Sequence, residues 1–189
     1  MDLLFRNSKK LYLIPLSIFS DLCHMPTELL IKPIFNDYVE QIVDLILPIQ
    51  QIEFNVPVTL EGQPDLLDVE TNYHTTGGGF WGAFIDNELI GTIAMISIGH
   101  NACALRKMFV KKEYRGKEIG AAQKLLDVLL DDCRKKGITD VYLGTVDMLK
   151  AAHRFYERNG FGRQTVEELP VYFPRMMADN VYFHLQVKK

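Results

Sequence analysis

The stretch from Met108 to Ala121 places a strand end, a short basic turn and a helix start in immediate succession. The run from Cys103 to Val110 is rich in apolar residues, as a strand is, and apolar residues at helical spacing follow Gly120. The turn carries Arg115, Lys117 and two glycines. The first N–H groups of a helix have no internal partner, and the helix dipole adds partial positive charge there. Because glycine also lets a phosphate approach the backbone closely, this stretch predicts a strand–turn–helix unit that binds an anion.

The same segment resembles the loop that binds the pyrophosphate of acyl-CoA in the GNAT superfamily of N-acetyltransferases. The family pattern is Arg or Gln, two residues, Gly, one residue, and then Gly or Ala. Arg115 occupies the first place and Gly120 the last, whereas Glu118 stands where the middle glycine usually is. That departure places a carboxylate near the expected phosphates. Taken alone, these residues also fit an ordinary strand-to-helix turn.

A second motif lies downstream, between Ala151 and Phe161. GNAT proteins carry an Ala four residues before a Tyr, which is followed by Glu, two residues, Gly and Phe. The chain has all of them, at Ala152, Tyr156, Glu157, Gly160 and Phe161. With both motifs at family spacing, the chain is identified, by resemblance, as a member of this superfamily. Leu149 stands where the family often has an Asn that bonds the pantetheine arm, so that contact is missing or supplied by another residue.

The resemblance implies an α/β (α+β) architecture, the GNAT fold. It consists of a central mixed, largely antiparallel twisted sheet of six to seven strands with helices on both faces. We predict one such domain at residues 26–189, since 189 residues suit a single core. Residues 1–25 are expected to form an N-terminal extension. Their apolar run from Leu11 to Phe19 imitates an export signal, but it lacks a small-residue cleavage site and is too short to span a membrane. A start codon placed too early is a further interpretation.

Apolar periodicity and turn residues predict the order of the elements. Asn36 is a predicted N-cap with Glu40 in the capping-box position, and Pro48 is expected to end or kink that first helix. The expected strands are residues 29–35, 80–85, 89–98, 103–110, 141–143, a strand starting at Phe161, and 181–187. The expected helices are residues 36–48, 65–69, 118–136 and 148–158.

Charge is distributed unevenly along the chain. Residues 101–163 hold 14 Lys and Arg against 8 Asp and Glu, whereas the segment from Pro33 to Leu105 holds ten acids and no Lys or Arg. A basic half that carries a phosphate loop beside an acidic half suggests an anionic cofactor that meets a cationic substrate. The alternative is that the acids form a solvated face. Nucleic acid binding is not expected, because the basic charge is modest and lacks interleaved aromatic residues.

The three cysteines, Cys23, Cys103 and Cys133, are widely spaced and odd in number. This argues against a disulfide framework and fits a reducing compartment, so we expect a cytoplasmic protein with no membrane partner. No Cys and His cluster has the spacing of metal ligands, and no metal is expected. A monomer or a homodimer is the expected assembly.

The resemblance also implies the cofactor contacts. Acetyl-CoA is expected as a co-substrate, with backbone N–H groups near Phe109 facing the thioester oxygen. Tyr156 is expected to protonate the leaving thiolate as a general acid. The expected contacts with acetyl-CoA are Met108, Phe109, Val110, Arg115, Gly116, Lys117, Glu118, Ile119, Gly120, Ala121, Ala152, Phe155 and Tyr156.

No motif names the acceptor, which we expect to be the primary amine of a small cationic or amino-acid-like molecule. In GNAT folds the first helix, the loop after it and the last loop line the acceptor side. Glu53, flanked by apolar residues, is therefore predicted to hold the ammonium and to take part in catalysis. Arg175 on the last loop is predicted to grip a carboxylate. The alternative is that Glu53 caps a helix and that Arg175 lies in solvent.

No motif marks the general base either. Glu53, Asp86, His74 and His100 are the candidates, acting directly or through water, whereas His153 is expected on the surface. Two other functions stay open: acetylation of a protein N-terminus or lysine, and a non-catalytic module that binds acyl-CoA.

Overall fold

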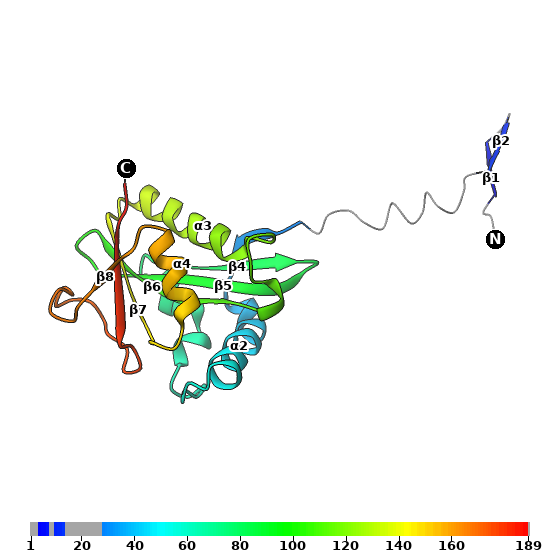
Figure 1. Cartoon of the computed structure of the whole chain (residues 1–189). Coiled ribbons are helices and arrows are strands. Elements are labelled where there is room, and N and C mark those ends of the chain that lie inside the picture. The colour runs from blue at the N-terminus through cyan, green and yellow to red at the C-terminus, as the bar shows by residue number, and fades with distance from the viewer. Residues whose placement is uncertain (1–3, 8–9, 14–27, 189) are drawn as a thin grey trace.

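The computed structural model describes residues 4–7, 10–13 and 28–188, and from residue 28 onward a seven-stranded sheet forms the centre (Figure 1). In the segment expected as an extension, β1 (Leu4–Asn7) and β2 (Lys10–Leu13) form a separate antiparallel pair. Residues 14–19 of the apolar run lie outside the described residues, and the boundary after residue 25 stays a prediction. Within the described part of the chain, no helix has the length and apolar character needed to cross a membrane.

The large sheet has the strand order β3-β4-β5-β6-β7-β9-β8. Only the β6–β7 pair is parallel, and the other neighbours are antiparallel, which confirms the expected mixed, largely antiparallel sheet. The strands are β3 (Leu30–Pro33), β4 (Gly79–Ile85), β5 (Glu88–Ser97), β6 (Ala102–Val110), β7 (Asp140–Thr145), β8 (Gly162–Gln164) and β9 (Val181–Gln186). The α-helices are α2 (Val39–Pro48), α3 (Ala121–Lys136) and α4 (Lys150–Arg158). Shorter 3-10 or π-helical segments lie at Asn36–Tyr38, Ile49–Glu53, Pro64–Leu66, Glu70–His74 and Lys112–Tyr114.

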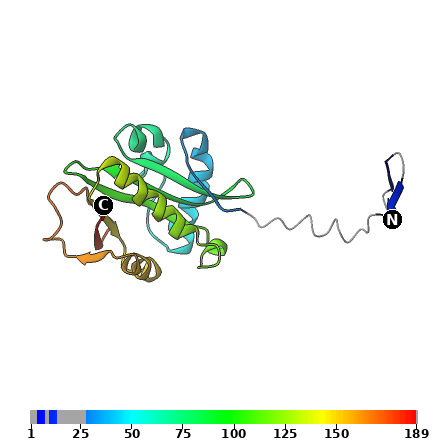
Figure 2. The same ribbon diagram turned by 90° about the horizontal axis from the view of Figure 1, so that it is seen from above.

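Helices cover both faces of this sheet, as expected, because each face is apolar. On one face, α3 buries a stripe that contains Leu125, Leu126 and Leu129 against inward side chains of the strands. On the other face, α2 buries Ile42 and Ile46. Figure 1 shows α3 and α2 on opposite sides of the strands, and Figure 2 shows α3 lying across the sheet when it is seen from above. The sheet therefore separates two apolar cores.

Local sequence explains most of the element ends. Asp86 and Asn87 join β4 to β5 in a two-residue hairpin, where both have positive φ angles of 48° and 65°. Asp and Asn tolerate that conformation better than other residues with a side chain. Gly137 ends α3 with a φ of 70°, and the backbone N–H of Ile138 donates to the carbonyl of Cys133 at 2.9 Å. Both ends match the sequence prediction.

Three expectations about helix ends are wrong. Asn36 does not cap its own helix, because its side chain instead bonds Asp68 and the backbone N–H of Glu70 across 32 and 34 residues. Residues 65–69 form no helix beyond the short turn Pro64–Leu66. The third helix starts at Ala121, three residues later than expected, because Gly120 adopts a left-handed φ of 69° that a helix cannot continue through.

The β6–β7 pair opens along its length. Ladder pairing joins Ala102–Ala104 of β6 to Asp140–Tyr142 of β7, yet β6 continues to Val110 and β7 to Thr145. On the β7 side, the backbone of β6 beyond Ala104 therefore has no strand partner. Unpaired backbone groups at a sheet opening must find other partners, so this opening can receive polar atoms of a ligand.

Candidate active site

The loop between β6 and α3 fits a pyrophosphate. Gly116 and Gly120 have φ angles of 125° and 69°, and a Cβ built on Gly116 would meet nothing within 4 Å. The first turn of α3 contains no acidic residue, and no side chain caps its N-terminus. The first N–H groups of α3 are thus available to an anion, and the helix dipole favours negative charge at this end of the helix. Lys117 and Glu118 are exposed, so the carboxylate at the unusual motif position does not cover the helix end.

Arg115 is already bound to a carboxylate. Its two terminal nitrogens donate to both oxygens of Glu53, with Nη2–Oε2 at 2.8 Å, and its Nε donates to the carbonyl of Val110 at 2.8 Å. The guanidinium carbon lies 5.7 Å from the ring centre of Phe54. Hydrogen bonds from Arg115 hold the pKa of Glu53 below its usual range. The structure thereby joins two residues, 62 positions apart, of which the sequence assigned Glu53 to the acceptor and Arg115 to the cofactor.

A bulge in β6 lies beside the sheet opening. Thr92 pairs with Phe109 and Ala94 with Arg106, so a single residue of β5 faces two residues of β6, Lys107 and Met108. Lys107 has a φ of 49°, a conformation rare for a residue with a side chain. Consecutive side chains of a regular strand point to opposite faces, but the extra residue changes that order.

The bulge places two cations on one face. Arg106 pairs across the ladder with Ala94, which belongs to the core under α2, and Lys107 contacts side chains of the loop that packs on the same core. Met108 packs instead with the core under α3. The opening is thus flanked by positive charge on the α2 face and by apolar atoms on the α3 face.

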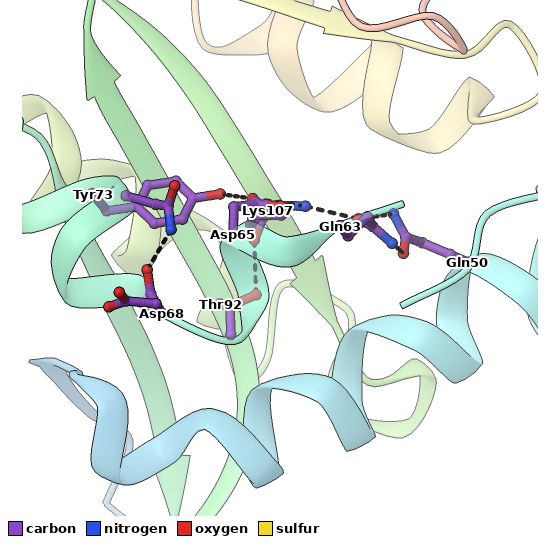
Figure 3. A network of polar contacts seen from close by, with 8 residues as sticks. Gln50, Gln63, Asp65, Asp68, Tyr73, Thr92 and Lys107 are labelled. Carbon is purple, nitrogen blue, oxygen red and sulfur yellow. Dashed lines mark hydrogen bonds and ion pairs between the residues drawn. The ribbon is translucent and has the colours of Figure 1, made fainter. Parts of the chain in front are cut away.

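Lys107 is held in a buried polar network, which Figure 3 shows. Its ammonium donates to Gln63 at 2.7 Å and lies 3.1 Å from the carboxylate of Asp65. The carboxylate of Asp65 also accepts a hydrogen bond from the hydroxyl of Tyr73, and Gln63 donates to Gln50. Thr92 donates to the carbonyl of Lys107 at 2.7 Å. The side chain of Lys107 is only 8% exposed. Burial lowers the pKa of Lys107, and the nearby charge of Asp65 opposes that shift.

Tyr156 reaches the same opening from α4. It is 6% exposed and packs against Phe161 and Phe183, and its hydroxyl lies 3.5 Å from the sulfur of Met108 on β6. Burial raises the pKa of Tyr156, and the negative charge of Asp179 adds to the shift. The phenol is therefore protonated at neutral pH and can donate a proton to a group in the opening. Ala152 and Phe155, predicted contacts from the same helix, are half-buried against the α3-side core.

The other predicted polar residues are scattered. His74 bonds the carbonyl of Ile34, next to β3 at the edge of the sheet, and Asp86 lies exposed in the β4–β5 turn. His100 lies in the β5–β6 turn, at the opposite end of β6 from the phosphate loop, and its ring stacks on Tyr172. Arg175 is exposed, without a hydrogen bond or ion pair to any residue that the structure describes. Of the four base candidates, only Glu53 contacts the loop.

His153 was expected on the surface, and this is wrong. It is 1% exposed, with Nε2 at 3.0 Å from the carbonyl of Val146. Residues three apart on a helix share a face, so His153 is buried on the same side as Tyr156. Its Nε2 thus bonds the backbone before α4, and its Nδ1 lies 3.4 Å from Nη2 of Arg163.

Arg106, Lys107 and Asp179 were not selected from the sequence. One signal could have found the first two: adjacent cations interrupt the apolar alternation of a strand between Leu105 and Met108. Such an interruption is consistent with an extra residue that changes the alternation of the strand. Asp179 carries no such signal, because it lies in an irregular loop. Among the described residues, no group of three or more His, Cys, Asp or Glu could hold a metal ion.

Comparisons with known proteins agree with the fold. A family model described as the acetyltransferase (GNAT) family matches residues 43–161. The crystal structure of an acetyltransferase of the GNAT family from Staphylococcus aureus Mu50 superposes with a TM-score of 0.82 at 37% identity, covering 85% of this chain and 100% of that one.

Two sequence relatives match at similar identity. The probable N-acetyltransferase camello of Xenopus tropicalis is 34% identical over 109 residues, 56% of this chain and 49% of its own length. The N-acetylaspartate synthetase of Danio rerio is 35% identical over 101 residues, 52% of this chain and 35% of its own. The chain thus spans half or less of the length of these relatives.

The Glu53–Arg115 pair predicts the effect of one substitution on acetyl-CoA affinity. Glu53 occupies both terminal nitrogens of Arg115 and repels phosphate. Glu53→Gln should lower the dissociation constant for acetyl-CoA by roughly three- to tenfold, since a charge-assisted pair no longer competes. Isothermal titration calorimetry measures this change. Glu61→Gln, an exposed acid of the same acidic segment, is the matched control and should leave the affinity unchanged. Weaker binding to Glu53→Gln would show instead that Glu53 orients Arg115 for the phosphate.

Lys107 predicts a pH dependence of stability. Because burial lowers its pKa, the protonated amine is disfavoured in the folded protein relative to the unfolded chain. That cost is present at neutral pH. This unfavourable contribution disappears as Lys107 loses its proton, between its lowered pKa in the folded protein and the pKa of about 10.4 in the unfolded chain. The free energy of unfolding of the wild type, relative to Lys107→Met, should therefore rise from about pH 7 to about pH 10. Urea unfolding at several pH values measures it, and a constant or falling difference would refute the assignment.

Proposed function

The chain belongs to the acetyltransferase (GNAT) family, and from that premise we propose that it transfers an acetyl group from acetyl-CoA to a primary amine. The acceptor is a small cationic or amino-acid-like molecule, and the transfer is direct, within a ternary complex. The observation that carries the proposal is the position of Tyr156. Its hydroxyl meets Met108 where β6 leaves β7, and β6 leads directly into the glycine loop and the N-terminus of α3.

In this proposal each element of the site binds one part of acetyl-CoA. The loop and helix start from Arg115 to Ala121 hold the pyrophosphate, with Arg115 exchanging Glu53 for phosphate oxygens. Backbone N–H groups near Phe109 that point to the unpaired edge of β6 face the thioester oxygen, where negative charge develops during the transfer. Ala152 and Phe155 present the apolar side of α4 to the cofactor. The unpaired edge of β6 supports this arrangement, because its backbone groups have no strand partner.

The chemical step needs one acid and one base. The amine nitrogen, after losing a proton, attacks the acetyl carbon, and the carbon–sulfur bond breaks. The departing thiolate takes the hydroxyl proton of Tyr156, and the excess proton that the nitrogen loses as the amide forms restores the Tyr156 hydroxyl through water. Burial raises the pKa of Tyr156, but the same burial penalises a thiolate, so both groups favour their neutral forms there. Glu53 is the proposed base, acting through water once phosphate has displaced it from Arg115.

The acceptor class rests on charge and on relatives. Three acids that contact the site region, Glu53, Asp65 and Glu88, pair with Arg115, Lys107 and Lys111. They are therefore not simply a solvated face. The relatives named N-acetylaspartate synthetase carry the name of an amino-acid product, which supports an amino-acid-like acceptor. Arg175 as a carboxylate ligand, a cytoplasmic location and a monomer or homodimer stay predictions. A protein N-terminus or lysine as acceptor is the second candidate.

A panel of amines tests the function. The protein is incubated with acetyl-CoA and each of a set of amino acids, polyamines, aryl amines and short peptides, and release of free thiol is followed. We expect turnover with at least one small amine, and a rise in melting temperature with acetyl-CoA alone, because a ligand that binds the native state stabilises it. Turnover confined to peptides would favour the second candidate. A melting shift without any turnover would indicate a binding module, and no shift at millimolar acetyl-CoA would refute the proposal.

Tyr156→Phe isolates the proposed acid. The variant keeps the buried ring and loses only the hydroxyl, so acetyl-CoA affinity should stay close to normal. Turnover should fall by about 10²-fold or more, the usual size of general acid catalysis. Steady-state kinetics and calorimetry on one preparation separate these effects. Tyr142→Phe, a half-buried tyrosine of β7, is the matched control. An unchanged turnover number would mean that another group protonates the thiolate or that a different step limits the rate.

A further inference from the structure

The two cations on the β6 bulge are not equivalent. Lys107 is neutralised by Asp65 inside the buried network. Arg106 donates through Nη2 to the backbone carbonyl of Pro174 at 2.5 Å. Over the ranges that the structure describes, it forms no ion pair with a carboxylate. A neutral carbonyl does not pair the positive charge of Arg106, and the guanidinium has further N–H donors to offer. Arg106 is therefore suited to an anionic group of a ligand.

A carboxylate lies on the same face of the sheet. The side chain of Asp179 covers Gly144 of β7 so closely that a Cβ added there would lie 2.1 Å from Oδ2. Leu143 packs into the α3-side core, and neighbouring residues of a strand point to opposite faces of the sheet. Position 144 therefore faces the α2 side, as Arg106 does. Glycine at position 144 thus makes room for this carboxylate beside the opening.

The backbone around Asp179 is firmly held. Its N–H donates to the carbonyl of Met176 at 3.1 Å, and its own carbonyl accepts from the hydroxyl of Tyr182 at 2.8 Å. The next residue, Asn180, donates to the carbonyl of Thr145 at 2.9 Å and accepts from the N–H of Asp147 at 2.8 Å. These bonds fix the last loop to the end of β7. The position of Asp179 therefore follows from the fold, not from a freely moving loop.

The charges of Arg106, Asp179 and Tyr156 influence one another. Burial raises the pKa of Asp179, and the charge of Arg106 opposes that shift without a direct ion pair. Asp179 in turn contributes to the raised pKa of Tyr156. Asp179 is therefore near enough to both groups for the charges to act on one another. No other carboxylate of the described residues has this relation to Tyr156.

We propose that Arg106 and Asp179 bind the two ends of the acceptor, Arg106 its carboxylate and Asp179 its ammonium, and so select amino acids over simple amines. The inference rests on the proposed acetyl transfer and names the residues that recognise its acceptor. The guanidinium of Arg106 can donate two N–H groups to the carboxylate of the acceptor. The two carboxylate oxygens of Asp179 can accept hydrogen bonds from the acceptor's ammonium beside the opening. The carbonyl of Pro174 already orients the guanidinium, which lowers the entropy lost on binding.

The test compares each amino acid that the panel finds active with its decarboxylated amine, in wild type, Arg106→Gln and Asp179→Asn. This variant removes the positive charge and keeps a polar, uncharged side chain at the position. We expect Arg106→Gln to raise the KM for the amino acid about tenfold or more. It should leave kcat/KM for the decarboxylated amine within roughly twofold. Asp179→Asn should raise the KM for both molecules, because both carry the ammonium.

Two measurements keep the outcomes distinct. Arg158→Gln, an exposed arginine of α4, is the control for general loss of positive charge and should change neither substrate. The melting shift with acetyl-CoA, recorded for each variant, verifies that the fold and the cofactor site are intact. Equal effects of Arg106→Gln on both substrates, or no effect on either, would overturn the inference. So would a wild type that prefers the decarboxylated amines. A wild type that acetylates no amine at all would refute the proposed function itself.

Discussion

The bulge at Lys107 is the constraint on which the candidate site depends. One extra residue in β6 turns two consecutive side chains to the same face and bends the strand where it leaves β7. A residue with a side chain at a φ of 49° persists only when its surroundings hold it there. Thr92 holds the carbonyl of Lys107 from β5, and Asp65 with Gln63 hold the ammonium from the loop after α2. The irregular loop and the bulge therefore stabilise each other.

The uneven charge of the chain has a structural outcome. The acidic segment and the basic segment do not remain two separate faces, because the fold brings them together as ion pairs. Glu53 meets Arg115, Asp65 meets Lys107, and Glu88 meets Lys111. Exposed pairs of this kind add little to stability, whereas the buried one is costly to break. Their placement along β6 and its loop indicates that they organise the site more than they stabilise the fold.

In the proposed function, the Glu53–Arg115 pair would also link the two substrates. If phosphate takes Arg115, the carboxylate of Glu53 is released beside the loop. Binding of the anionic cofactor would then create negative charge where a cationic acceptor needs it. The free energy of the ion pair would then be the coupling free energy between cofactor binding and acceptor binding. Linkage requires that each binding event favour the other to the same extent.

Much of this protein could be predicted from its sequence because the signals are local. Apolar periodicity marks the strands and helices, Gly137 marks a helix end, and the spacing around Arg115 and Tyr156 marks the family. Local signals failed where a distant partner decided the outcome. Asn36 has the side chain of a helix cap, but it bonds Asp68 in a loop 32 residues away. A cap is worth about 1 kcal/mol, so a competing tertiary hydrogen bond can override it.

Which charges meet was decided only by the tertiary structure. The sequence by itself indicated a basic, glycine-containing turn before a helix, a family motif around Tyr156 on a later helix, and an excess of acids before an excess of bases. It did not determine that Glu53 would hold Arg115, or that Asp179 would cover Gly144 within reach of Arg106. Such contacts join residues far apart along the chain. They depend on strand order, on one bulge and on the missing side chain of a glycine, and each of these takes effect only once the sheet is assembled.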